Sequence, residues 1–184
     1  MLWQIVQRPD AFEDTKKNVL ELLAKIAQFF SSSQLDFLFS KIELKFSGKR
    51  DVDQSTEGTS GGLPVPSSTS DEIDDLLLMV QKLARSDSSG NAAERTLTLL
   101  WRAAREVSIR ETHEISCGRN ENETDRLSTA DRTTAVFASV LSHYNGLGVE
   151  CASVSTWTLK CLQEITHATD GRDIAAAARV FKAV

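Results

Sequence analysis

The residues in this chain whose types could support chemistry are its three cysteines and three histidines. His113 and Cys117 are four residues apart, a spacing that places both on one face of a helix. A second group lies nearer the C-terminus and consists of His143, Cys151, Cys161 and His167. Zinc ligands usually occur in closer pairs, and no motif marks any of these cysteines as an activated nucleophile. Buried thiols that pack as small apolar groups explain the cysteines better. We therefore predict no catalytic residue, no metal site and no cofactor.

One acidic cluster and the absence of known motifs lead to the same expectation. Asp71, Glu72, Asp74 and Asp75 could attract a cation, but acidic residues at the start of a helix are explained by the helix dipole. The sequence also contains no glycine-rich phosphate loop, no HExxH, no GxSxG and no paired CxxC. Whether the chain is an enzyme is left open, because none of its residues identifies a reaction.

Two tryptophans are candidates for a different role. Trp101 and Trp157 each lie among aliphatic residues at helical spacing, so we predict that both pack in the core. The alternative is an exposed anchor for a partner protein, because tryptophan is over-represented at binding hot spots.

Composition limits the partners and the compartment. The 184 residues are 41% apolar and 26% charged, with a formal net charge of −5, which suits one domain or two small ones. Nucleic acid is not expected, because basic residues are not clustered. No stretch resembles a signal peptide or a membrane helix, and three sparse cysteines do not suggest a disulfide framework. We expect a cytoplasmic protein whose partners are other proteins.

The elements that must position these residues are helices, and the clearest are two neighbouring stretches. In 71–84, apolar residues recur at the spacing of one helical face: Ile73, Leu76, Leu77, Val80, Leu83 and Ala84. A polar turn follows, with Asn91 as the expected N-cap. A second apolar stripe then occupies 91–107, with Ala93, Leu97, Leu100, Ala104 and Val107. Two amphipathic helices joined by a short turn predict an antiparallel hairpin.

The rest of the chain suggests further helices and one long loop. Residues 1–46 predict an N-terminal helical hairpin, and the apolar face of its first helix is Val19, Leu22, Leu23, Ile26, Phe29 and Phe30. Residues 71–184 predict a helical-repeat segment in which 108–129 is weakly patterned. The helix that follows this stretch should be capped by Asp131 and should end at Asn145-Gly146. Residues 47–70 are rich in Gly, Ser, Thr and Pro, which predicts a disordered loop. We expect an all-α protein, organised as an armadillo/HEAT-like α-solenoid of stacked hairpins, with a closed helical bundle as the alternative.

Several segments together carry a resemblance to a known family. They are Thr15 to Glu21, Ser33 to Ile42, Val80 to Arg85, Ala93 to Trp101 and Trp157 to Ile165. Their order is similar to that in the helical-repeat region of the large ubiquitin-specific proteases of the fat-facets (FAF-X) type. There, too, an element of the form S-x-Q-L-D-x-L-F-x-K-I precedes a helix ending in L-A and a helix closing on L-L-W.

The resemblance implies an armadillo-like scaffold of a deubiquitinase. The family's cysteine and histidine boxes are missing, and none of Cys117, Cys151 and Cys161 lies in a G-x-T-C-Y context. No catalytic role is therefore carried over to this chain. The expected function is protein–protein interaction, or positioning of a protease domain. The alternative is a general armadillo-type adaptor unrelated to ubiquitin.

Overall fold

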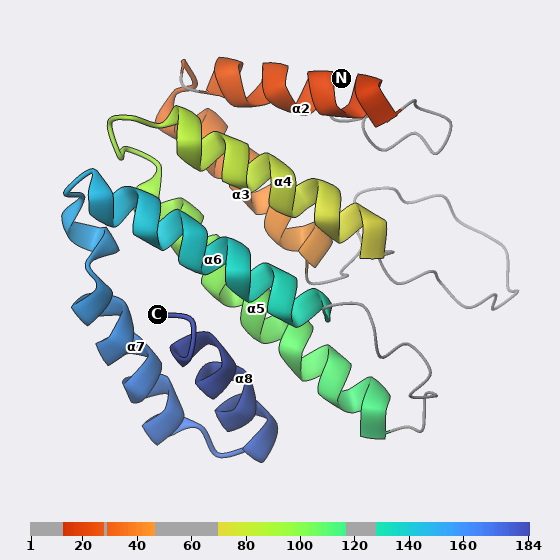
Figure 1. The fold of residues 1–184 in the computed structure, drawn as a ribbon, viewed down its shortest axis with the longest axis vertical. Helices are drawn as coiled ribbons and strands as arrows, with labels where there is room; N and C mark the ends of the chain where they lie inside the picture. Colours follow the sequence, from red (N-terminus) through yellow and green to blue (C-terminus); the bar gives the residue numbers. More distant parts are fainter. Residues whose placement is uncertain (1–12, 28, 47–69, 117–127) are drawn as a thin grey trace, which may run out of the picture.

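The computed structural model describes residues 13–27, 29–46, 70–116 and 128–184, and within these ranges all regular structure is helical (Figure 1). The elements in chain order are α2 (Glu13–Ala27), α3 (Ser32–Phe46), α4 (Ser70–Ser86), α5 (Ala93–Ser116), α6 (Thr129–Gly146), the short 3-10 helix η1 (Glu150–Ala152), α7 (Val154–His167) and α8 (Gly171–Phe181). The prediction of an all-α protein is confirmed for this part of the chain. The predicted loop lies outside the described residues, apart from Ser70, which begins α4.

Helices α2 to α6 lie in two rows, because α4 packs on both α2 and α6, while α3 packs on α5. One row contains α2, α4 and α6, and Figure 1 shows these three side by side. The other contains α3 and α5, and α8 also packs on α5. Contact between α5 and α6 joins the rows most extensively. The predicted hairpin of α4 and α5 is present, but its two helices contact their row neighbours more than each other.

Helix α5 is the centre of the core, since it packs on α3, α6, η1 and α8. Apolar residues around most of its circumference are buried: Ala93, Leu97, Leu99, Leu100, Trp101, Ala103, Ala104 and Val107. A helix that is apolar on several faces needs neighbours on several faces. The apolar stripe predicted for α4 is also buried throughout.

The apolar faces predicted for the outer helices are partly wrong. In α2 and its following turn, Leu22 is 46% exposed and Phe29 is 81% exposed, whereas Leu20 and Leu23 are buried. Helix α2 lies at the end of its row, so only the narrow face against α4 is covered. Periodicity identifies which residues are apolar, but the number of neighbouring helices determines how many of them are buried.

Three helix boundaries differ from expectation. Helix α5 continues to Ser116, beyond the predicted end at Val107, because Arg110 and Glu111 make contacts to α3 and α6 that hold its last turns. The N-cap of α6 is Ser128 and not Asp131, since the Ser128 hydroxyl accepts the Asp131 N–H at 3.1 Å. Helix α5 begins at Ala93, two residues after Asn91, which was the expected N-cap. The Ala92 N–H donates to the Asp87 carboxylate.

Candidate interaction surface and the clusters that support it

Trp101 and Trp157 lie together in the core and not on the surface. They are 2% and 4% exposed, and their ring centroids are 5.8 Å apart. Phe137 of α6 completes the cluster, with its ring 6.1 Å from Trp101 and 5.2 Å from Trp157. Tilted and edge-on aromatic pairs at these distances add to the stabilisation that burial provides. Burial favours the packing role predicted for both tryptophans, and a binding role stays a prediction.

Both indole N–H groups have hydrogen-bond partners, as buried polar groups require. The Trp101 Nε1 donates to Glu164 Oε1 at 3.2 Å, and the Trp157 Nε1 donates to the Cys151 carbonyl at 2.9 Å. Glu164 also pairs with Arg105, whose Nη1 lies 2.5 Å from Glu164 Oε2. The aromatic cluster therefore links α5 and α6 to α7 through tilted and edge-on ring contacts, and the Glu164 carboxylate adds a link between α5 and α7.

A groove lies between α3 and α5 on the described surface. Its larger part has a volume of about 420 Å³, and an adjoining part of about 310 Å³ shares Ser40, Glu43, Leu99 and Arg102 with it. Hollows of several hundred cubic ångströms are typical of binding sites. The walls alternate apolar residues, such as Leu99 and Ile109, with charged ones.

Opposite charges face each other across this groove. Arg95 Nε of α5 lies 2.6 Å from Asp36 Oδ1 of α3, and Arg102 Nη1 lies 2.9 Å from Glu43 Oε1. These side chains are 36–62% exposed, so solvent screens the pairs and each contributes little to stability. A partner with its own charged side chains can therefore replace these pairs at a modest energetic cost.

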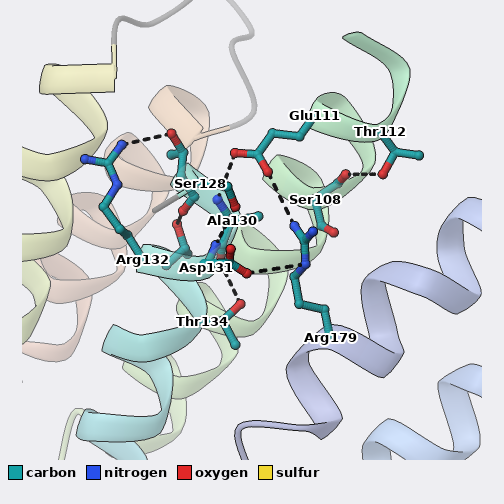
Figure 2. Close-up of polar contacts among 11 residues, drawn as sticks. Ser108, Glu111, Thr112, Ser128, Ala130, Asp131, Arg132, Thr134 and Arg179 are labelled. Atoms are coloured by element: carbon teal, nitrogen blue, oxygen red, sulfur yellow. Dashed lines mark hydrogen bonds and ion pairs between the residues drawn. The ribbon is translucent and has the colours of Figure 1, made fainter. Parts of the chain in front are cut away.

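A polar junction on the opposite side of α5 ties three helices together (Figure 2). The Glu111 carboxylate of α5 accepts the Ala130 N–H of α6 at 3.0 Å and pairs with Arg179 Nη1 of α8 at 3.3 Å. Arg179 Nε also lies 3.6 Å from Asp131 Oδ1. Glu111 thus supplies a carboxylate to the N-terminus of another helix, where the macrodipole favours negative charge. Every charged member has a structural partner, so we assign this junction no reaction.

The turn between α4 and α5 is held by a second network. The Asp87 carboxylate accepts hydrogen bonds from the Ser89 hydroxyl, the Ala92 N–H and the buried Tyr144 hydroxyl. Burial, and then the Asp87 charge, raise the pKa of Tyr144 well above its ordinary value. Gly90 has a φ of +72°, and a Cβ there would lie 2.5 Å from a methyl carbon of Val149. The turn is therefore fixed against the segment that follows α6.

The predicted chemistry-bearing residues are dispersed in the part of the chain that the structure describes. Burial raises the pKa of Cys161 to about 11, and burial likewise raises that of Cys151. Raised thiol pKa values lower the thiolate fraction, which is the opposite of nucleophile activation. The ring of His143 lies 5.4 Å from that of Tyr144 in a tilted arrangement, and His113 and His167 are exposed. Cys117 lies outside the described residues.

Among the residues with a described placement, no three His, Cys, Asp or Glu side chains are grouped so that they could hold a metal ion. None of the described helices combines the length and apolar character needed to cross a membrane. The groove between α3 and α5 was not predicted from the sequence. The recurrence of arginine along one side of α5 is the only sequence feature that could have indicated this groove.

Known proteins add no assignment. No protein-family model, curated protein or solved structure matches this chain.

Proposed function

We propose that this chain is a non-catalytic helical-repeat scaffold that binds other proteins through the groove between α3 and α5. The observation that carries the proposal is the packing of alternate helices into two rows. In an α-solenoid, the first helices of successive hairpins form one row and the second helices form the other. The succession α2, α4, α6 beside α3 and α5 is compatible with that organisation, and it favours an armadillo/HEAT-like solenoid over a closed bundle.

The properties of the thiols support a non-catalytic role. A cysteine protease needs a thiolate, a histidine base and a group that orients the histidine. Cys161 is fully buried and its thiol pKa is raised to about 11, so it is unsuited to nucleophilic attack near neutral pH. Cys151 has its thiol pKa shifted in the same direction by burial.

We further propose that the scaffold belongs to a deubiquitinase of the fat-facets type. This part of the proposal rests on the sequence segments described above, including Ser33 to Ile42 in α3 and Ala93 to Trp101 in α5. These two segments form most of the walls of the smaller part of the groove. The partner would then be the protease domain or one of its substrates. A general armadillo-type adaptor unrelated to ubiquitin is the second candidate.

Titration of this chain with the purified protease domain of a fat-facets-type ubiquitin-specific protease tests the proposal. We expect saturable binding that Arg102→Glu weakens at least tenfold, because the reversed charge would repel Glu43 and alter the groove. The control is Lys25→Glu, which reverses a charge in a comparably exposed ion pair on α2, away from the groove.

Three outcomes would count against the proposal. Failure to bind the protease domain would favour the adaptor unrelated to ubiquitin. Equal loss of affinity in the Arg102→Glu and Lys25→Glu variants would exclude the groove as the binding surface. Covalent reaction of any cysteine with a ubiquitin-based active-site probe would overturn the non-catalytic role.

A further inference from the structure

The packing of α8 on the rest of the molecule uses small side chains. Its buried residues are Ala176, Ala177 and Val180. Hydrophobic stabilisation grows with the apolar area removed from water, so an interface made by two alanines and a valine contributes little. Helix α4 in contrast buries two aliphatic or sulfur-containing side chains in almost every turn, among them Leu76, Met79 and Val80. The packing of α8 on α5 therefore depends more on polar interactions than the packing of α4 on its neighbours does.

Two arginines flank this small apolar strip. On one side, Arg105 of α5 lies 2.5 Å from Glu164 of α7 and 3.8 Å from Asp173 of α8. On the other, Arg179 of α8 lies 3.3 Å from Glu111 and 3.6 Å from Asp131. We call these the Arg105 clamp and the Arg179 clamp. Their side chains are 24–45% exposed, so salt in the solvent screens both clamps.

Beyond its two buried side chains, Trp157 and Cys161, helix α7 makes few contacts with the central helices. Its closest backbone approaches are to α8 and to η1, and Figure 1 shows α7 at the outer edge of the molecule. Leu159 and Leu162 on its outer face are 57% and 44% exposed. Its first turn is anchored, however, because the Trp157 indole donates to the Cys151 carbonyl in η1. Helices α7 and α8 pack closely on each other and can therefore move as one unit.

We propose that the α7–α8 hairpin is a hinged lid that opens about the η1–α7 junction while the other described helices stay folded. The Arg105 and Arg179 clamps hold the lid shut over Trp101 and Phe137. Opening removes the Glu164 carboxylate from the Trp101 indole and uncovers the aromatic cluster. The protein thereby has a second conformation, which differs from the first in the exposure of Trp101 and Phe137.

Hydrogen exchange of the intact chain, resolved by peptide, tests the lid at low and high salt. We expect amides in 158–167 and 171–181 to exchange through an opening that is more frequent than global unfolding, and amides of α4 and the first half of α5 to exchange only with global unfolding. High salt should raise the exchange rate of the lid amides about threefold or more, because it screens two clamps of partly exposed ion pairs. The exchange of α4 should change less.

Two variants separate the lid from general destabilisation. Glu164→Gln keeps an acceptor for Trp101 but removes the charge that pairs with Arg105, and Arg179→Met removes the other clamp. Each should accelerate exchange in the lid by about two- to fivefold and leave α4 unchanged. The control is Arg95→Met, which deletes an ion pair between α5 and α3 and should not affect the lid.

The proposal is overturned if lid amides of the unaltered chain exchange no faster than those of α4. It is also overturned if salt and the two clamp variants change lid and α4 exchange equally, or if Arg95→Met accelerates the lid as much as they do. Should Arg179→Met prevent folding, Glu164→Gln and the salt dependence of the unaltered chain still decide the question.

Discussion

Replacing Trp101 by alanine tests how much the aromatic cluster stabilises the fold, because this side chain of α5 contacts both α6 and α7. Trp101 is 2% exposed, contacts the rings of Phe137 and Trp157, and donates a hydrogen bond to Glu164. Truncating a buried large aromatic side chain to alanine costs about 3–5 kcal/mol. The Glu164 carboxylate keeps Arg105 as a partner, so no further cost for an unpaired charge is expected.

The assay is urea denaturation followed by far-ultraviolet circular dichroism. We expect a loss of about 3–5 kcal/mol in the free energy of unfolding for Trp101→Ala. For a chain of this length, that loss lowers the melting temperature by about 6–20 °C. Trp101→Phe keeps a ring but removes the N–H donor, so it should cost clearly less. Phe37→Ala is the control, because Phe37 is 67% exposed and should change stability by about 0.5 kcal/mol or less.

The reasoning is refuted if Trp101→Ala costs less than about 1 kcal/mol, which is the value typical of an average substitution. If unfolding is unchanged while the affinity for a partner protein falls tenfold or more, Trp101 is a binding hot spot. The lid described above would then be open in solution.

Three further predictions concern the turn, the helix junction and the buried thiol. Gly90→Ala should destabilise the fold by about 1–3 kcal/mol more than Gly148→Ala, as measured by thermal unfolding, because both have a positive φ but only a Cβ at Gly90 meets Val149. Glu111→Gln should cost about 1 kcal/mol or more, measured by urea denaturation, because it weakens the cap of α6 and the pair with Arg179 together. The folded-state pKa of Cys161 lies above its ordinary value of 9.0, so its contribution to stability is complete below about pH 9 and is lost as pH rises through about 11. Urea denaturation across that pH range should show a smaller alkaline loss of stability for Cys161→Ala than for the unaltered chain, and an equal loss would contradict this assignment.

Local pattern was sufficient to predict the helices themselves. The apolar residues of α4 recur with a period near 3.6, and all six that the pattern placed on one face are buried. The end of α6 at Gly146 agrees with the predicted stop at Asn145-Gly146, although the glycine with a positive φ is Gly148. Such features depend on residues within one or two turns of each other, so the chain carries them without reference to its fold.

Features that depend on distant residues could not be predicted. The continuation of α5 to Ser116 depends on Glu111 meeting the start of α6, 19 residues away. Leu22 has the same apolar character as Leu23, yet only Leu23 is buried, because α4 covers one face of α2. The aromatic cluster, the groove and the two clamps likewise join residues from different helices. Hydrophobic periodicity states which face a helix must bury, whereas side-chain size and charge at the contacts select the partner that buries it.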